Sequence, residues 1–142
     1  MKKKDKLYRS ALKTTDLAEA VTLLTQAHEA GSHDAAYLLG SWHLTGKHIT
    51  SGDNAAIRYL QFALEGDVPE AYFDLAICYE SGKGVKKDKR KAFLHYMEAA
   101  LLGHPRALYA VGRCYYYGVG VDKDEDLAKI WLSRSDDSLE MD

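Results

Sequence analysis

The sequence lacks the features that mark membrane-spanning and nucleic-acid-binding proteins. Its 142 residues carry a formal net charge of only −2, so no strong attraction to nucleic acid or to anionic lipid is expected. No apolar run approaches the roughly 20 residues that a membrane-spanning helix needs. Cysteine and proline are scarce, with two of each. The apolar content of 46% is nevertheless enough for a buried core, so we expect a globular protein with neither a nucleic-acid nor a membrane partner.

The chain contains one pattern three times, with a period of 36 residues from Ala35 to Ala71 to Ala107. Internal repetition at this period is typical of stacked helical hairpins. The copies cover residues 34–69, 70–105 and 106–138, and residues 1–33 hold a partial copy that caps the array. We therefore predict an all-α fold, a right-handed α-solenoid of antiparallel helix hairpins. It forms one domain over residues 1–138, followed by an acidic tail at 139–142.

Each copy predicts two helices. Apolar residues recur every three or four positions, as on one face of a helix. A first helix (helix A) ends at a glycine, Asp88 or Asp124 caps the second (helix B), and Gly66 or Gly103 ends helix B. The expected helices are 3–13, 16–30, 34–45, 53–65, 70–81, 88–102, 106–117 and 124–134. Ser135 and Asp136 replace an Ala-Ala pair of the preceding copy, so the chain is expected to fray there.

The two cysteines, Cys78 and Cys114, occupy the same position of neighbouring copies. Equivalent atoms of stacked hairpins lie about 8–10 Å apart, beyond the roughly 7 Å between Cα atoms that a disulfide can span. We expect two reduced, buried thiols. Arg9, Lys13 and Asp16 interrupt the apolar stretch that a signal peptide would need, so the expected location is the cytoplasm.

The copy at residues 70–105 has the fullest version of the pattern. Its matching residues are Ala71, Leu75, Tyr79, Gly82, Gly84, Val85, Asp88, Lys91, Ala92, Tyr96, Ala99, Ala100 and Gly103. The chain thereby resembles the Sel1-like repeat family, a relative of the tetratricopeptide repeat, over about residues 14–135. The first copy departs most, with His48 replacing the second glycine and His43 the tyrosine. The resemblance implies a scaffold for protein complexes, and bacterial members of the family include immunity proteins that neutralise toxins.

The sequence offers no convergent catalytic set. Ser10 and Lys13 match the S-x-x-K of penicillin-recognising enzymes, but the companion S-D-N and K-T-G elements are absent. The glycine-rich loops at 82–85 and 118–121 lack the remaining residues of a phosphate-binding loop and recur as helix stops. His43 and His48 could meet across a turn, but a metal site would lack its other ligands. We predict a protein that is not an enzyme, with no catalytic, cofactor or metal site.

One stretch of the chain is strongly basic. Its cations are Lys83, Lys86, Lys87, Lys89, Arg90 and Lys91. The equivalent loop of the next copy, residues 122–126, is mostly acidic. Nucleic-acid binding usually needs a basic patch that extends along a face with stacking aromatics. We expect the two loops to face each other as a solvated, salt-bridged edge, with an acidic protein partner as the alternative.

The resemblance also implies that helix A of each copy lines the concave side of the solenoid. The helix-A residues offset from the buried face would then be exposed, with Tyr37, Phe73 and Tyr109 as an aromatic row. Aromatic and arginine side chains dominate binding because they bury a large area at low entropic cost. The expected partner-binding residues are Tyr37, Ser41, Leu44, Phe73, Ile77, Glu80, Tyr109, Arg113, Tyr116 and Tyr117. In the alternative, the rings pack on helix B of the neighbouring copy.

Two function classes follow from these observations. In the first, a monomeric chain without a cofactor acts as an adaptor that binds another protein or a peptide on the helix-A face. In the second, the chain is an immunity or inhibitor protein that covers the active site of a bacterial toxin. A reading frame for a toxic domain directly upstream would favour the second class.

Overall fold

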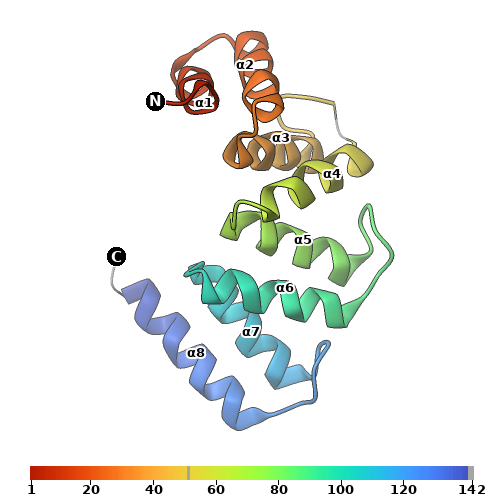
Figure 1. Cartoon of the computed structure of the whole chain (residues 1–142). Coiled ribbons are helices and arrows are strands. Elements are labelled where there is room, and N and C mark those ends of the chain that lie inside the picture. The colour runs from red at the N-terminus through yellow and green to blue at the C-terminus, as the bar shows by residue number, and fades with distance from the viewer. Residues whose placement is uncertain (51, 141–142) are drawn as a thin grey trace. The chain divides into compact units, whose positions relative to one another are not determined.

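The computed structural model describes the backbone of residues 1–50 and 52–140, and the side chains of that part up to Asp136. All regular structure in this part is α-helical (Figure 1), as the repeat predicts. The helices are α1 (Lys3–Lys13), α2 (Leu17–Glu29), α3 (His33–Thr45), α4 (Asp53–Leu64), α5 (Pro69–Ser81), α6 (Lys89–Leu101), α7 (Pro105–Tyr117) and α8 (Glu125–Glu140). The expectation that the chain frays at Ser135 is wrong, because α8 continues to Glu140.

The chain divides into two compact units, Met1–Ala71 and Tyr72–Asp142, with the boundary near the start of α5. In the first unit α1 packs on α2, α2 on α3, and α3 on α4. In the second unit α6 packs on α7, and α7 on α8. Helix A of the three copies is α3, α5 and α7, and helix B is α4, α6 and α8. Helices that are neighbours in the sequence are therefore neighbours in space within each unit.

Side chains cap the helices where the pattern predicts. Asp16, Asp88 and Asp124 precede α2, α6 and α8, and each carboxylate accepts a hydrogen bond from the backbone N–H three residues on, at 3.2, 3.0 and 3.0 Å. These bonds satisfy N–H groups that the first helical turn leaves unpaired. His104 caps α7 in the same way, since its Nδ1 lies 3.3 Å from the backbone nitrogen of Ala107. The repeated aspartate is therefore a structural residue.

The turn after helix A needs left-handed backbone. Gly46, Gly82 and Gly118 have φ angles of 71°, 79° and 74°, which glycine adopts without the clash that a Cβ causes. The second glycine of this turn is also left-handed in the later copies, and His48 keeps a φ of 71° in the first copy. That conformation costs a residue with a side chain about 1–2 kcal/mol. The edge-on contact of the His48 ring with Trp42, with centroids 4.7 Å apart, offsets part of the cost.

Gly66 has a different role from the predicted one. The residue with left-handed backbone after α4 is Asp67, with a φ of 54°, and not Gly66. A Cβ on Gly66 would instead overlap the side chain of His33. The His33 ring stacks on Phe62 with centroids 4.9 Å apart. Glycine at position 66 therefore permits close side-chain packing.

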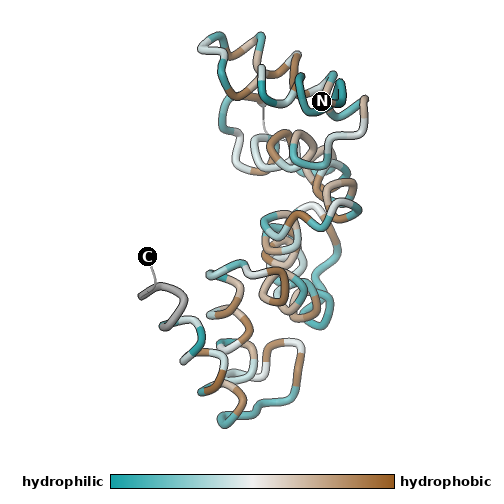
Figure 2. Tube along the Cα trace, turned by 60° about the vertical axis from the view of Figure 1, so that its left-hand side comes forward, coloured by the Kyte–Doolittle hydropathy of each residue, from teal (hydrophilic) through white to brown (hydrophobic). Residues whose placement is uncertain are grey.

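Each unit has its own hydrophobic core. In the first unit Leu24 and Leu39 are buried among alanines, and in the second Val111 and Cys114 are buried with Phe93. Figure 2 shows hydrophobic and hydrophilic residues alternating along the helices, as expected where one face of each helix is buried. Neither Cys78 nor Cys114 forms a disulfide, and both are at most 1% exposed, which confirms the prediction of two buried thiols. No described helix combines the length and apolar composition needed to cross a membrane.

Candidate protein-interaction site

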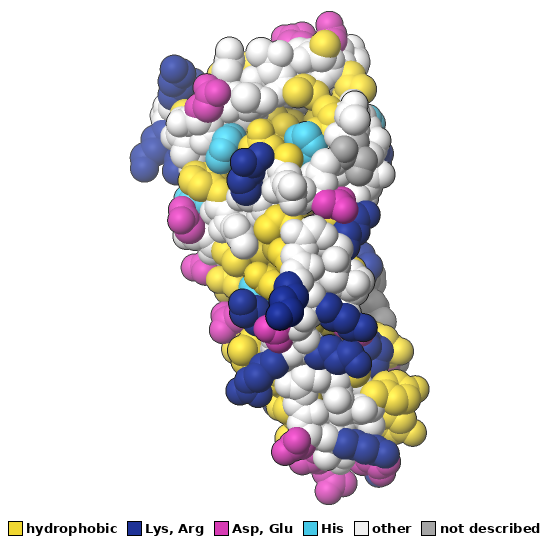
Figure 3. Space-filling view, turned by 90° about the vertical axis from the view of Figure 1, so that its right-hand side faces the viewer, with side chains coloured by type: hydrophobic (Ala, Val, Ile, Leu, Met, Phe, Trp, Pro, Cys, Tyr) yellow, Lys and Arg dark blue, Asp and Glu magenta, His cyan; other side chains and the backbone are white. Residues whose placement is uncertain are grey.

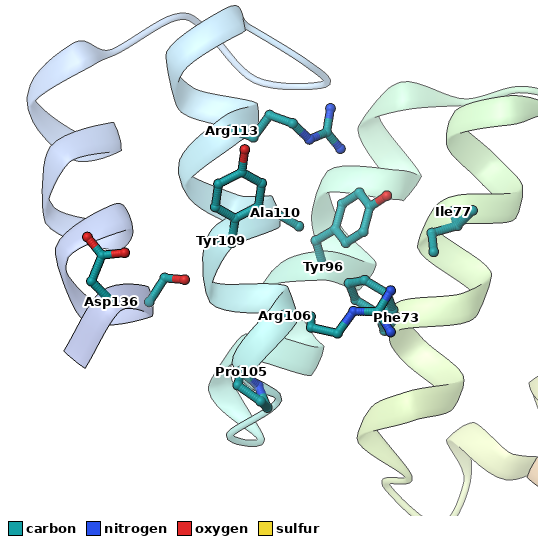
Figure 4. Close-up of a pocket in the computed structure, with 10 residues that line it drawn as sticks. Phe73, Ile77, Tyr96, Pro105, Arg106, Tyr109, Ala110, Arg113 and Asp136 are labelled. Carbon is teal, nitrogen blue, oxygen red and sulfur yellow. The ribbon is translucent and has the colours of Figure 1, made fainter. Parts of the chain in front are cut away.

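The second unit contains a pocket of about 490 Å³ between α5, α7 and the C-terminal part of α8 (Figure 4). We call it the main pocket. It is lined by Phe73, Ile77, Tyr96, Pro105, Arg106, Tyr109, Ala110, Arg113, Ser135 and Asp136. Most of these residues belong to α5 and α7, which are helix A of the second and third copies. The helix-A side of this unit is therefore recessed.

Phe73 forms part of the floor of the main pocket. It is 7% exposed, so the prediction that it is an exposed member of the aromatic row is wrong. Its ring stacks on His104, with centroids 4.7 Å and planes 9° apart, and meets the edge of the Tyr96 ring at 5.7 Å. The Arg106 guanidinium lies 4.8 Å from its centroid. Phe73 thus supports the pocket from below, and its truncation would damage the core as well as the surface.

Glu80 and Arg113, both predicted partner contacts, bind each other. The Glu80 carboxylate accepts hydrogen bonds from both terminal nitrogens of Arg113, at 3.1 and 2.7 Å, and from the Tyr96 hydroxyl at 2.9 Å. The hydrogen bond from Arg113 lowers the pKa of Glu80 below its ordinary value, and burial, followed by the bond to Glu80, raises the pKa of Tyr96. At neutral pH the pair is ionised and the Tyr96 hydroxyl keeps its proton. This cluster links α5, α6 and α7.

Four predicted contacts present exposed apolar surface around the main pocket. Ile77, Tyr109, Tyr116 and Tyr117 are 41%, 57%, 45% and 70% exposed. A second pocket is lined by Tyr109, Arg113, Tyr116, Tyr117 and Leu132, and a third by Ile77, Glu80 and Ser81. Both share residues with the main pocket. We call the three pockets together the binding face. All seven partner contacts predicted in the second unit lie on it.

The predicted contacts of the first unit are less accessible. Tyr37, Ser41 and Leu44 lie on α3, and all three are half-buried. The repeat assigns Tyr37, Phe73 and Tyr109 equal exposure, but the first is half-buried, the second buried and the third exposed. Within the predicted aromatic row, Tyr109 therefore presents the most ring surface.

Several residues of the main pocket were not among the predicted contacts. Tyr96 and Ala110 belong to the buried face of their helices, with 3% and 5% exposure, yet they reach the pocket wall. Ser135 and Asp136 were assigned to a fraying tail. Arg106 belongs to the same exposed stripe of helix A as the predicted contacts of the third copy, and this position is the sequence signal for it.

The backbone beside the two charged stretches of the second unit comes close together. A Cβ on Gly120, two residues before the acidic loop, would overlap the backbone carbonyl of Lys89 at the start of α6. Figure 3 shows Lys and Arg side chains gathered over this side of the second unit, with Asp and Glu side chains at its lower end. The ion pair of Lys123 is within its own loop, with Glu125 at 3.5 Å. Salt bridges between the two loops stay a prediction.

The histidines of the first unit are involved in aromatic packing. His43 stacks on Tyr59, with centroids 5.6 Å apart, and His28 meets the edge of the same ring at 5.1 Å. His48 packs on Trp42 instead, with centroids 4.7 Å apart. Burial lowers the pKa of His28 below its ordinary value. Among the residues that the structure describes, no group of three potential metal ligands lies together.

Comparison with known proteins identifies the repeat. The Sel1 repeat pattern matches residues 33–68, 69–104 and 105–135. The chain is 32% identical over 94 residues to the mouse protein named DAP3-binding cell death enhancer 1, and 33% identical over 85 residues to its rat counterpart. These matches cover 66% and 60% of this chain but 18% and 16% of the relatives. The chain thus spans less than a fifth of their length.

Solved structures of similar fold support the same assignment. A Sel1 repeat protein from Oxalobacter formigenes has a TM-score of 0.87 at 27% identity, over 95% of this chain and 41% of that one. A protective antigen of uropathogenic Escherichia coli with an SLR fold has a TM-score of 0.83 at 27% identity, over 94% and 29%. Sel1 repeats generally mediate protein–protein interactions and are typically non-catalytic. The chain has the fold of these helical solenoids and belongs to the Sel1 repeat family.

Proposed function

We propose that this chain is a protein-interaction module that holds a segment of a partner protein on the binding face of its second unit. The observation that carries the proposal is the main pocket, in which Ile77 and Tyr109 stay exposed above a floor of packed rings. Its volume of about 490 Å³ is enough to hold more than one side chain of a partner. Exposed rings on a fixed base bury large area at low entropic cost, as binding hot spots do.

The chemistry of the binding face favours binding over catalysis. Its carboxylate–guanidinium pair is internally satisfied, and the high pKa of Tyr96 makes that hydroxyl a donor and not a base at neutral pH. Burial raises the pKa of the nearby Cys114 thiol to about 11, so the thiolate that a nucleophile requires is scarce. These groups stabilise the wall of a docking surface.

Site-specific photo-crosslinking tests this proposal. A benzophenone side chain would replace Tyr109, which is 57% exposed on the binding face, and in a control protein Leu101, which is 68% exposed on α6. We expect the probe at Tyr109 to capture a protein from the native cell that the probe at Leu101 does not. The affinity of the identified partner is then measured for Tyr109→Ala, Ile77→Ala and Leu101→Ala.

We expect each of the first two changes to weaken binding by about 1–2 kcal/mol, the scale of a central anchor. The change at Leu101 should leave affinity within about twofold, since it lies off the binding face. If Leu101→Ala weakens the complex while Tyr109→Ala does not, the partner docks elsewhere and the proposal is wrong. A captured toxin whose activity the chain blocks would assign the module to the immunity class, and a partner in a larger assembly would assign it to the adaptors.

A further inference from the structure

Arg106 presents a rigidly supported guanidinium in the main pocket. Its Cζ lies 4.8 Å from the centroid of the Phe73 ring. The Phe73 ring in turn packs against the stacked His104 ring and the edge of the Tyr96 ring, whose centroids lie 4.7 and 5.7 Å away. A planar guanidinium that already stacks on a fixed ring loses little further freedom when it forms hydrogen bonds. Arg106 is therefore preorganised for a ligand.

The N–H groups of Arg106 have no acceptor among the described residues. Arg113, in the same pocket, differs because both of its terminal nitrogens bind Glu80. In Figure 4 the Arg106 side chain lies beside Phe73, whereas Arg113 lies farther along α7. A guanidinium fork matches a carboxylate in a bidentate arrangement. The main pocket thus combines one satisfied cation with one that is open to an incoming anion.

Apolar surface lies next to this open cation. Ile77 and Tyr109 line the same pocket and are 41% and 57% exposed, and Ala110 forms part of the wall. An occupant that covers these groups must present an apolar side chain within a few residues of its anion. A free inorganic anion would leave that apolar surface in water.

The remaining charge in the pocket argues against a polyanion. Asp136 also lines the main pocket and is exposed, so a chain of phosphates or a run of acidic residues would meet a like charge there. The main pocket also shares residues with a pocket on each side, through Ile77 on α5 and through Tyr109 and Arg113 on α7. A bound chain can therefore pass through the pocket, with its acid supplied by a side chain.

We propose that the main pocket recognises an internal partner segment with a single Asp or Glu side chain, which Arg106 binds, close to an apolar side chain that covers Ile77 and Tyr109. This inference rests on the proposed function and adds the chemistry of the partner to it. Arg106 supplies the specificity for acid, and the apolar wall supplies most of the buried area.

Peptide display tests the inference with a probe of known composition. The full chain is used to select from a library of random 12-residue peptides with blocked ends, and the selected sequences are compared with those from Arg106→Gln. Arg134→Gln is the matched control, because its guanidinium also lies over a ring, 5.4 Å from Trp131, but outside the main pocket. The best acidic peptide is then measured beside its Asn or Gln counterpart by titration calorimetry.

We expect the natural chain and Arg134→Gln to enrich one acidic residue near an apolar one, and to bind the acidic peptide about tenfold or more tightly than its amide. Arg106→Gln should bind both peptides equally, within about twofold. If Tyr109→Ala weakens binding but Arg106→Gln still binds the acidic peptide about tenfold more tightly than its amide, the inference is wrong and the proposed function stands. If no peptide is enriched, or if Tyr109→Ala leaves binding intact, both are wrong.

Discussion

The cluster of Glu80, Arg113 and Tyr96 predicts a measurable coupling energy within the second unit. The Glu80 carboxylate receives three hydrogen bonds, from the Tyr96 hydroxyl and from two nitrogens of Arg113, at 2.9, 3.1 and 2.7 Å. Glu80→Gln keeps the size of the side chain but removes its charge. Arg113→Met keeps most of the aliphatic stem but removes the guanidinium. The two changes and their combination form a double-mutant cycle.

The exposure of the Glu80 and Arg113 side chains sets the expected size of their coupling energy. Exposed ion pairs contribute about 0.2–1 kcal/mol, and breaking a buried pair costs about 3–5 kcal/mol. The side chains of Arg113 and Glu80 are 28% and 27% exposed, between these limits, and the geometry is bidentate. Because solvent screens this partly exposed pair, its coupling energy should be smaller than the cost of breaking a buried pair. We expect about 1–2 kcal/mol.

Urea denaturation provides the assay. The first unit contains Trp42 and the second Trp131, so a Trp42→Phe background makes tryptophan fluorescence report on the second unit. The free energy of unfolding is measured for the background, both single variants and the double variant. A coupling energy below about 0.3 kcal/mol, within the usual error of additivity, would show that the ion pair contributes nothing to the second unit.

The pH dependence of the coupling gives a second check. The pKa of Glu80 is lower in the folded chain than its ordinary value of 4.5, so the folded state holds fewer protons on this group than the unfolded state as the pH falls below that value. The contribution of Glu80 is therefore fully present above pH 4.5 and lost as the pH falls through the depressed folded pKa. Glu80→Gln should remove this part of the acid sensitivity. If the free energy of unfolding falls equally with pH in the natural chain and in Glu80→Gln, the acid sensitivity does not come from Glu80 and the reasoning is wrong.

Three further experiments test the packing of the second unit. Trp131→Ala should lower the free energy of unfolding by about 1–3 kcal/mol, less than the roughly 3–5 kcal/mol for a fully buried ring, because Trp131 is only half-buried at the edge of the core; urea denaturation checks this. Cys114 should react with a thiol reagent only after unfolding, since it is 0% exposed with a pKa raised to about 11; fast labelling of folded protein would contradict it. Gly120→Ala should destabilise more than Gly103→Ala, because both have positive φ but a Cβ clashes only at Gly120; equal melting temperatures would contradict it.

The fold could be predicted from the sequence because the period of 36 residues identifies the helix faces that pack into the core. Gly40 and Gly112 illustrate the constraint. A Cβ on either would lie within 3.0 Å of a leucine side chain, Leu60 or Leu132, on the helix B that packs against it. Glycine at this position lets helix A and helix B of one copy approach closely. A small residue recurs at this position in every copy, with Ala76 in the second, so the pattern predicts the order of the helices and the limits of all but α8, which continues past residue 134.

Two expectations about the fold were wrong. In each, a residue other than the one in the repeat pattern fits the same space or the same backbone conformation. Ser135 replaces an alanine of the repeat, yet it is 1% exposed, because serine is small enough for the position. The helix therefore continues where the loss of the Ala-Ala pair predicted fraying. Asp67 takes a left-handed conformation, with a φ of 54°, which the pattern assigned to the neighbouring glycine. At Ser135 polarity was the wrong criterion and volume decided the structure. At Asp67 a residue other than glycine adopts the backbone conformation that the pattern reserved for glycine.

The candidate site depends on contacts that the repeat does not specify. Phe73 and Tyr109 hold the same position in successive copies, but their exposed fractions are 7% and 57%. His104 and Arg106, at the start of α7, lie on the Phe73 ring, at 4.7 and 4.8 Å, and cover it. Within the described part of the chain, no residue covers Tyr109 in the same way. Equivalent positions in a repeat thus become floor or contact surface according to the residues at the start of the next helix A. This is why the sequence predicted the stripe that forms the binding face but not which ring of the stripe is available to a partner.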